Sequence, residues 1–252
     1  MKEISLEKFG LLTKQIGKNC QYFDEISSTN LYLLENCECF SHGTVITAGY
    51  QTQGKGRQQR EWMGEKETSL LFSVLLKPDL PLELKLKIVF AAACAVKLSI
   101  HKLYGITPSV KWPNDIYIEN KKIAGILCQM SGNSVIAGIG VNVNQEELPE
   151  SIRSIASSLY LISSQKLEVF HVLSVILNYL EKFSLTLEQE GFFPIREEIL
   201  KNFYLKGKTV SVETGKDIIT GMVTGMDEDG HLLLDTGNRV KTIFAGDAHI
   251  CS

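Results

Sequence analysis

The fold is decided by residues 109–144, which read SVKWPNDIYIENKKIAGILCQMSGNSVIAGIGVNVN. Two turn signals, Glu119-Asn120 and Ser131-Gly132-Asn133, divide this stretch into three segments that are rich in apolar and β-branched residues. Such segments joined by tight turns are typical of an antiparallel meander of three strands. Glycine within a strand often marks the close approach of a ligand or of another backbone, and the three segments contain Gly125, Gly138 and Gly140.

A glycine-rich loop over residues 51–62, QTQGKGRQQREW, lies between two apolar runs that we expect to be strands, 44–48 and 70–76. Its glycines allow backbone N–H groups to approach a ligand without a Cβ in the way, and its cations suit an anion. A phosphate site is one interpretation, and a solvated connection between two strands is the other. The glycines and cations are Gly54, Gly56, Lys55, Arg57 and Arg60.

Two familiar glycine loops do not fit this sequence. A P-loop that begins at Gly49 would need a serine or threonine where Gly56 stands, and no apolar helix follows. A dinucleotide-binding loop built on Gly54 and Gly56 would need a third glycine at position 59, which is Gln59. The loop is therefore expected to bind its ligand in another way.

The composition is that of a soluble globular protein, because 44% of the 252 residues are hydrophobic, 22% are charged and the net charge is −3. These values exclude the disordered class and argue mildly against a dedicated nucleic-acid binder. The six cysteines form no C-x-x-C pair, which fits a reducing cytoplasm. The chain has no apolar signal segment and no run of about 18 apolar residues, so we expect neither secretion nor a membrane span.

The remaining patterns predict helices and strands around these two stretches. Residues 21–26 alternate like a strand, and the Ser/Thr/Asn cluster at 27–30 is typical of a helix N-cap, which can also face a polar ligand. Apolar residues with helical spacing occur over 4–17, over 82–104 between Pro81 and Gly105, over 167–187 and over 194–202.

The pattern changes after Tyr204 to short alternating runs with turn residues between them, which predict a small β-barrel. We therefore expect an α+β protein with two domains. Residues 1–203 would form a central mixed, largely antiparallel sheet with flanking helices, and residues 204–252 the barrel. The predicted strands of the barrel are 209–213, 218–226, 231–235 and 239–244.

The order and spacing of the motifs resemble those of biotin protein ligases over roughly residues 20–145. The C-terminal strands resemble the SH3-like domain of the same family. The resemblance implies a catalytic domain like that of class II aminoacyl-tRNA synthetases, followed by an SH3-like barrel. The motifs that carry it are Ser28-Thr29-Asn30, the G-K-G-R loop with Trp62, Lys111-Trp112-Pro113-Asn114-Asp115, Lys122-Ile123-Ala124-Gly125 and Gly138-Ile139-Gly140-Val141-Asn142.

The resemblance implies a reaction in two steps. Biotin and Mg-ATP would form biotinyl-5'-adenylate with release of pyrophosphate, and biotin would then pass to one lysine of a biotin carboxyl carrier domain. A carboxylate that attacks the α-phosphorus brings negative groups together, so the site needs cations, N–H donors and a metal ion. The five histidines are scattered, so no protein metal ligand is assigned and Mg²⁺ is expected to arrive with ATP.

The resemblance also implies roles for individual residues. Arg57 and Lys122 would be catalytic. Our own candidate to orient or deprotonate the acceptor lysine, whose ordinary pKa is about 10.4, is Asp115, because it stands beside Lys111 and Asn114. Biotin would bind to Ser28, Thr29, Asn30, Gln51, Gly54, Gly125 and Gly138. ATP and the adenylate would bind to Lys55, Arg57, Arg60, Trp62, Lys111, Asn114, Lys122, Val141 and Asn142. The loop would close over the adenylate as a lid that excludes water.

Two positions in the loop depart from the family pattern. Lys55 replaces the first arginine of G-R-G-R, which keeps the charge and loses the planar fork of the guanidinium. Gln59 replaces a glycine that many relatives have, which predicts a loop that folds less freely. The C-terminal residues 248–252 lack a basic residue that some members use near ATP, so no catalytic residue is assigned there.

Two alternatives remain open: a lipoate or octanoate ligase or transferase with the same fold, and a non-catalytic regulator that senses biotin. The 27 residues before Ser28 are too few for a winged helix-turn-helix, so we expect the monofunctional type, without the N-terminal DNA-binding domain and without operator binding. We also expect a cytoplasmic protein that has no membrane partner. A homodimer through an edge strand such as 126–130 is possible.

Overall fold

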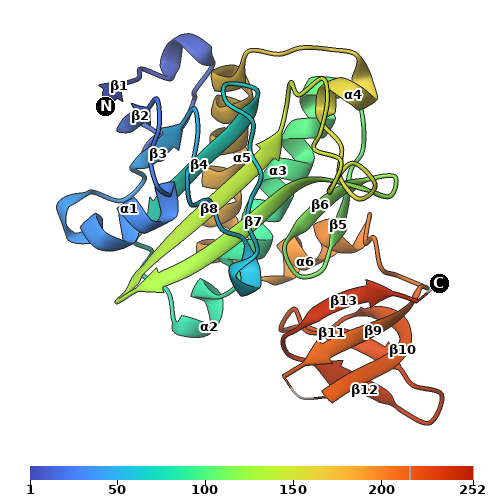
Figure 1. Cartoon of the computed structure of the whole chain (residues 1–252). Coiled ribbons are helices and arrows are strands. Elements are labelled where there is room, and N and C mark those ends of the chain that lie inside the picture. The colour runs from blue at the N-terminus through green and yellow to red at the C-terminus, as the bar shows by residue number, and fades with distance from the viewer. Residues whose placement is uncertain (216, 252) are drawn as a thin grey trace.

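The computed structural model describes residues 1–215 and 217–251 of the chain. Figure 1 shows a large unit with a mixed sheet and helices, and a second, smaller unit of antiparallel strands at the C-terminus. The predicted α+β class and the two kinds of sheet are confirmed. The division between residues 203 and 204 stays a prediction.

The large sheet has eight strands in the order β1-β2-β3-β4-β8-β7-β6-β5. Only β2 and β3 pair in parallel, and every other neighbouring pair is antiparallel, as predicted. The strands are β1 (Lys2–Glu3), β2 (Cys20–Phe23), β3 (Val45–Ala48), β4 (Ser69–Leu76), β5 (Ser109–Lys111), β6 (Asp115–Ile118), β7 (Lys121–Ser131) and β8 (Ser134–Asn142).

The meander differs from the prediction in its first segment. We expected one strand over residues 109–118, but the chain forms the hairpin β5–β6, in which Lys111 pairs with Asp115. The turn of this hairpin is residues 112–114, with a cis peptide bond between Trp112 and Pro113. Proline cannot donate to a strand ladder, which explains why the strand does not continue through this position. The meander therefore has four strands, and the K-W-P-N-D motif lies at its first turn.

Helices cover the two faces of the large sheet differently. Helices α3 (Ile88–Tyr104) and α5 (Val169–Glu190) pack against each other behind the sheet (Figure 1) and bury the alternate apolar side chains of β4. Helix α1 (Thr29–Asn36) packs on the opposite face, where Leu33 meets Leu75 of β4. Among residues 1–215 and 217–251 no helix covers the rest of that face, and the candidate site lies there.

The expected helix over residues 82–104 is divided in two. Helix α2 (Leu82–Lys85) ends before Lys87, whose backbone N–H bonds to the carbonyl of Leu84 three residues earlier, and α3 then begins at Ile88. The predicted end at Gly105 is confirmed, with a left-handed φ of 69°. The other short elements are α4 (Leu159–Ser163), α6 (Phe193–Leu200) and the 3₁₀ turns Glu7–Phe9, Cys37–Cys39 and Arg57–Gln59.

The helix predicted over residues 4–17 is wrong, because only Glu7–Phe9 forms a single 3₁₀ turn. Side chains of α5 take the place of helical hydrogen bonds there. The Glu181 carboxylate accepts the backbone N–H groups of Lys14, Gln15 and Ile16 at 2.7, 2.8 and 3.0 Å. The apolar spacing reflects contacts with the core instead, since Leu6, Leu11 and Ile16 are buried.

The small unit is a five-stranded antiparallel sheet in the order β12-β11-β10-β9-β13. Four of its strands match the predicted runs, and the fifth, β13, was not predicted. An SH3-like barrel stays a prediction. The strands are β9 (Thr209–Thr214), β10 (Asp217–Met226), β11 (Leu232–Asp235), β12 (Val240–Ile243) and β13 (Asp247–Ile250).

None of the helices formed by residues 1–215 and 217–251 is both long enough and apolar enough to cross a membrane.

Candidate active site

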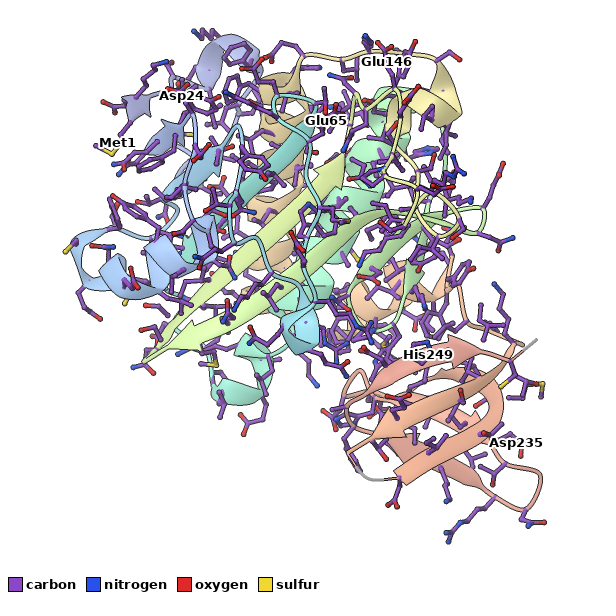
Figure 2. All side chains as sticks on the ribbon, viewed as in Figure 1. Met1, Asp24, Glu65, Glu146, Asp235 and His249 are labelled. Atoms are coloured by element: carbon purple, nitrogen blue, oxygen red, sulfur yellow. The ribbon has the colours of Figure 1, made fainter. Side chains whose placement is uncertain are left out.

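A cavity of about 490 Å³ opens on the uncovered face of the large sheet. Its walls come from the start of α1, the glycine-rich loop, the meander and β13. Figure 2 labels His249 of β13, at the edge of the small unit that faces the large one, and this residue lines the cavity. The predicted residues on the wall are Ser28, Thr29, Asn30, Gln51, Lys55, Arg57, Arg60, Trp62, Lys111, Asn114, Asp115, Lys122, Gly125, Gly138 and Asn142.

Two predicted residues do not line this cavity. Val141 is fully buried in the core of the large unit. Gly54 lies behind Gln51, since a Cβ at Gly54 would come within 3.0 Å of Gln51 Nε2. Its carbonyl accepts the backbone N–H of Trp62 at 2.9 Å, which closes the base of the loop.

Neutral polar side chains form one end of the cavity. The Ser28 hydroxyl caps α1 by accepting the N–H of Leu31 at 3.3 Å. The backbone N–H of Thr29 donates to Gln51 Oε1 at 2.7 Å, and the amide of Asn30 donates from Nδ2 to Gln129 Oε1 at 2.8 Å. The sequence indicated Ser28, Thr29, Asn30 and Gln51, while Ser73 and Gln129 in this network were missed because they lie within apolar strands.

This polar network has more acceptor contacts than hydroxyl protons. Three oxygen pairs are in hydrogen-bonding distance: Thr29 Oγ1 with Gln51 Oε1 at 3.0 Å, Thr29 Oγ1 with Ser73 Oγ at 2.7 Å, and Ser73 Oγ with Asn30 Oδ1 at 2.6 Å. The other contacts of the two amides fix their orientation, so both amide oxygens face the hydroxyls as acceptors. When Thr29 Oγ1 donates to Ser73 Oγ and Ser73 Oγ donates to Asn30 Oδ1, Gln51 Oε1 still accepts the backbone N–H of Thr29. Each amide oxygen has a second lone pair that can accept an N–H group of a ligand.

Three glycines of the meander leave room for side chains above the sheet. A Cβ at Gly140 would come within 2.5 Å of Trp62 Cε2, and a Cβ at Gly125 within 2.9 Å of Trp62 Cζ3. A Cβ at Gly138 would come within 2.2 Å of Asn30 Oδ1. The glycines therefore form a trough in which the indole lies. Trp62 Nε1 is buried and has no hydrogen-bond partner within the described residues.

A cluster of charges lies beside the trough. Lys122 Nζ is 2.8 Å from Asp115 Oδ1 and 5.5 Å from the centre of the Trp62 ring. Lys111 Nζ lies 5.2 Å from the centre of the Tyr117 ring. Burial lowers the pKa of Lys111, although the negative charge of Asp115 opposes this shift. The cluster is suited to stabilise a developing negative charge on a ligand at this end of the cavity.

The arginines of the loop meet a carboxylate from the small unit. Arg57 Nη1 lies 3.2 Å from Asp247 Oδ1 and 3.3 Å from Asn114 Oδ1. Arg60 Nη2 lies 2.9 Å from Asp247 Oδ2. The sequence did not indicate Asp247, because the contact depends on how the small unit docks against the large one.

The loop itself has an uncommon backbone. Gln58 and Gln59 adopt left-handed φ angles of 53° and 61°, a region that non-glycine residues rarely occupy and that stores strain. Lys55 Nζ donates to Gln59 Oε1 at 2.7 Å. The two residues that depart from the family pattern therefore contact each other.

The chain matches two family profiles, the Biotin/lipoate A/B protein ligase family over residues 22–146 and the Biotin protein ligase C terminal domain over residues 206–249. It is 35% identical to the Bifunctional ligase/repressor BirA of Bacillus subtilis, over 96% of this chain and 77% of that protein. It is 30% identical to the Biotin--[acetyl-CoA-carboxylase] ligase of Mycobacterium tuberculosis, over 88% of this chain and 85% of that protein.

A solved structure supports the same relationship. The biotin protein ligase from Aquifex aeolicus, in complex with biotin and ATP, superimposes with a TM-score of 0.83 at 31% identity. The match covers 95% of this chain and 99% of that chain, so it includes both units. From the identities, the two profiles and the shared fold, we conclude that this chain belongs to the biotin protein ligase family.

Proposed function

We propose that this protein is an ATP-dependent biotin protein ligase. It activates biotin to biotinyl-5'-AMP with release of pyrophosphate and transfers biotin to a lysine of a biotin carboxyl carrier protein. The supporting observation is that one cavity joins a neutral polar end, a glycine trough and a cluster of cations. The relatives named as biotin ligases, one of them solved with biotin and ATP, support the same reaction.

The hydrogen-bond acceptors at the polar end favour biotin over lipoate. The ureido ring of biotin carries two N–H groups, whereas the dithiolane ring of lipoate has no hydrogen-bond donor. A biotin N–H can donate to an amide oxygen of this network, Gln51 Oε1 or Asn30 Oδ1. A lipoyl ring can make no such hydrogen bond, and one hydrogen bond contributes about 0.5–1.5 kcal/mol. We therefore place the ureido ring at Ser28, Thr29, Asn30 and Gln51.

In the first step the cations stabilise charge where the biotin carboxylate meets the α-phosphate. Lys122 reaches the cavity from the meander and Arg57 from the loop. Both are already paired with carboxylates, Lys122 with Asp115 and Arg57 with Asp247. These ion pairs hold the two cationic side chains in place before ligands bind. When ATP and biotin bind, Lys122 and Arg57 contact the phosphate and carboxylate groups instead. Trp62, Lys55, Arg60, Lys111 and Asn142 complete the adenylate side.

In the second step the acceptor lysine attacks the carbonyl of the mixed anhydride, and AMP leaves. The attacking amine must first lose a proton, and Asp115 is the carboxylate on the cavity wall that we assign to orient the ammonium group and accept that proton. The loop acts as the lid that keeps water from the anhydride during the exchange.

Magnesium fits this cavity as a companion of ATP. No cluster of three or more His, Cys, Asp or Glu side chains arranged to hold an ion occurs in residues 1–215 and 217–251. Mg²⁺ is usually bound by one or two carboxylates together with substrate phosphates. No residue of the chain is assigned to hold the ion, which would arrive with ATP and be held by its phosphates. When bound, the ion neutralises charge between the phosphate oxygens.

The remaining properties are part of the proposal. The protein is cytoplasmic, does not bind operator DNA and has an SH3-like C-terminal barrel. A homodimer would form along β7, whose residues 127–131 pair only with β8 among the described strands. A sequence-specific gel shift that resists salt would contradict the absence of operator binding. Sedimentation velocity tests whether the homodimer forms.

One experiment separates the ligase from its alternatives. The purified protein is incubated with Mg-ATP, a purified carrier domain and either labelled biotin or labelled lipoate, and the carrier lysine is analysed by mass spectrometry. We expect the biotinylated lysine only, and its formation should require ATP. A lipoylated lysine would support the lipoate ligase. Biotin binding without acylation of the carrier would support the biotin-sensing regulator.

A further inference from the structure

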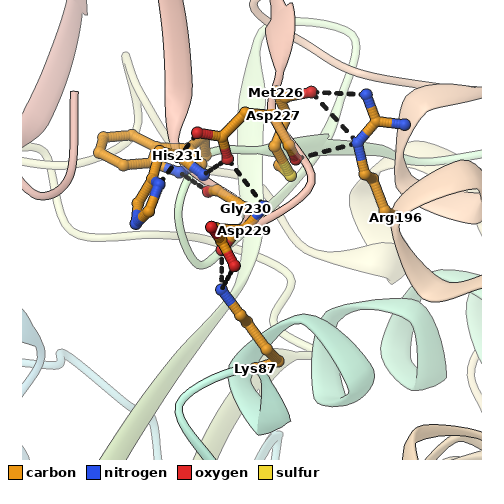
Figure 3. Close-up of polar contacts among 8 residues, drawn as sticks. Lys87, Arg196, Met226, Asp227, Asp229, Gly230 and His231 are labelled. Atoms are coloured by element: carbon orange, nitrogen blue, oxygen red, sulfur yellow. Dashed lines mark hydrogen bonds and ion pairs between the residues drawn. The ribbon is translucent and has the colours of Figure 1, made fainter. Parts of the chain in front are cut away.

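The small unit is fastened to the large one at the β10–β11 turn, Asp227–His231, which we call the buttress turn (Figure 3). Trp112 Nε1 donates to the carbonyl of Gly230 at 2.9 Å. Lys87 Nζ donates to the carbonyl of Asp229 and lies 3.6 Å from its carboxylate Oδ1. The buttress turn is therefore held by the first turn of the meander and by the beginning of α3.

A third donor comes from α6. The guanidinium of Arg196 donates from Nε and Nη2 to the carbonyl of Met226 at 3.1 and 2.7 Å, and from Nε to the carbonyl of Asp227 at 2.9 Å (Figure 3). Helix α6 is itself tied to α3 by Lys97, whose Nζ lies 2.9 Å from Glu198 Oε1 inside the large unit. The support of the buttress turn thus reaches into the core.

The buttress turn keeps its shape through its own side chains. Asp227 Oδ1 accepts the backbone N–H groups of Asp229 at 2.9 Å and His231 at 2.8 Å, and Oδ2 lies 3.0 Å from His231 Nδ1. Burial opposes ionisation of Asp227, but these hydrogen bonds outweigh it and the pKa of the carboxyl is lowered. The turn therefore presents the Gly230 carbonyl to Trp112 in a fixed direction.

Gly230 packs so closely against the large unit that no side chain would fit at this position. Its φ is 85°, and a Cβ there would come within 2.7 Å of Phe90 Cε2 and 3.3 Å of Phe192 Cε1. Gly237, in the next turn, has nearly the same φ of 86°, but a Cβ there would meet no atom within 4 Å. The two glycines therefore have nearly the same φ, but only Gly230 is packed against the large unit.

The position of Trp112 matters to the site because Asn114 and Asp115, which follow it closely, bind the adenylate and act on the acceptor lysine in our proposal. Trp112 is 3% exposed and begins the turn that presents Asn114 and Asp115 to the cavity. Asn114 Nδ2 donates to the carbonyl of Ile126 at 2.7 Å, so the far end of this turn is anchored within the meander. The near end is anchored by the buttress turn, which belongs to the other unit.

We propose that the buttress turn is a positioning element for the reaction, a statement that rests on the proposed function. By holding the indole of Trp112 it sets the placement of Asn114 and Asp115 relative to Arg57 and Lys122. The small unit contributes no reacting group through this contact. Through Trp112, it fixes the positions of Asn114 and Asp115, which belong to the large unit.

The test compares Gly230→Ala with Gly237→Ala. Both replacements put alanine in the same left-handed conformation, so both lose similar stability from backbone strain, but only Gly230→Ala pushes the buttress turn away from Phe90. We expect kcat for carrier biotinylation to fall about 10- to 100-fold in Gly230→Ala, because small misplacements of catalytic groups have effects of this size. KM for biotin should stay unchanged, since the polar end is anchored elsewhere. Gly237→Ala should keep the wild-type kcat.

A spectroscopic measurement follows the contact directly. The chain has two tryptophans, so its NMR spectrum contains two indole N–H signals, which Trp62→Phe assigns. In Gly230→Ala the Trp112 signal should shift and exchange faster with solvent, and in Gly237→Ala it should not. Adding Phe90→Leu to Gly230→Ala should restore part of the lost kcat, because it removes the clashing ring atoms.

A second pair protects the test if Gly230→Ala does not fold. Lys87→Met removes a donor to the buttress turn, whereas Lys85→Met removes a similarly buried lysine that reaches Asn133 instead. Lys87→Met should lower kcat and perturb the Trp112 signal, and Lys85→Met should do neither. The positioning role is overturned if the wild type is active and kcat does not differ between Gly230→Ala and Gly237→Ala, nor between Lys87→Met and Lys85→Met. Wild-type protein that transfers no biotin would instead overturn the proposed function.

Discussion

Arg57 Nη1 of the glycine-rich loop lies 3.2 Å from Asp247 Oδ1 of the small unit, with the two side chains 28% and 13% exposed. Arg57 Nη2 also donates to the carbonyl of Gly246 at 3.1 Å, and Asp247 pairs with Arg60 at 2.9 Å. The cations that we assign to phosphate are therefore held by a carboxylate before any ligand binds. Phosphate binding becomes an exchange of one anion for another.

The first prediction concerns this exchange. Asp247→Asn removes the competing charge, so we expect KM for ATP to fall about two- to fivefold, the size that partly exposed ion pairs allow. Steady-state kinetics with ATP as the varied substrate measures it. Glu213→Gln is the control, because Glu213 pairs with Asp247 between β9 and β13 but is exposed. An unchanged or higher KM in Asp247→Asn would show that Asp247 does not compete with ATP.

The second prediction concerns Ser73, whose hydroxyl joins Thr29 to Asn30. Ser73→Ala leaves Asn30 Oδ1 without that donor, so we expect KM for biotin to rise about tenfold, consistent with about 1–3 kcal/mol for an unsatisfied buried group. KM for ATP should not change. Ser69→Ala, in the same strand and also buried, is the control, since Ser69 bonds to Gln145 instead. A rise of the same size in both variants would indicate general damage to β4.

The glycine trough was predictable from the sequence. Glycine weakens the interior of a strand, so its presence there indicates that a ligand or another backbone comes close. Gly125 and Gly138 were assigned to the ligand on this ground together with the family resemblance, and they do line the cavity. Ser28 and Thr29 likewise belong to a helix N-cap signal that the sequence displays, whereas Lys122 was assigned through the family resemblance. Fold class and the order of most elements were predictable for the same reason, since local periodicity determines them.

Contacts that join distant segments were not predictable. Residues 4–17 have helical spacing, but Glu181 on α5 satisfies their backbone N–H groups and the helix is not formed. Asp247 meets Arg57 where the small unit docks against the large one. Ser73 looks like an ordinary strand residue until α1 brings Thr29 and Asn30 to it. Tertiary packing overrides local pattern at each of these positions.

The third prediction concerns the strained loop. Gln59→Gly should relieve the left-handed φ of 61° and raise the free energy of unfolding by about 1 kcal/mol, or Tm by about 2–4 °C. Gln53→Gly, at an exposed position of the same loop without a positive φ, should lower Tm slightly. Thermal unfolding of both variants measures the difference. A lower Tm in Gln59→Gly would mean that its contact with Lys55 outweighs the strain.

The fourth prediction concerns pH and the N-terminal segment. Burial tends to raise the pKa of Glu181, but the three backbone N–H groups outweigh it and the pKa is lowered from 4.5. Its stabilising effect is therefore complete above pH 4.5 and is lost as pH falls through the lower folded value. Glu181→Gln should lose about 1.5–3 kcal/mol at pH 7.

The difference from wild type should shrink as the solution is acidified below pH 4.5, because wild-type Glu181 then becomes neutral as well. Denaturant unfolding at several pH values measures this, with Glu188→Gln on the same helix as the control. A difference that stays constant with pH would mean that the charge of Glu181 is not what holds residues 14–16.

The last prediction separates the two steps at Asp115. Its carboxylate lies 2.8 Å from Lys122 Nζ. Asp115→Asn leaves Lys122 and Arg57 in place, so adenylate formation should fall less than tenfold. Transfer of preformed adenylate to the carrier should slow about 100-fold, the usual contribution of a positioned base. The defect should narrow as pH rises toward about 10.4, where the acceptor amine loses its proton without help. Single-turnover transfer measured from pH 7 to 10 tests this. A defect that is independent of pH would leave Asp115 with a role in placing Lys122 and remove it from proton transfer.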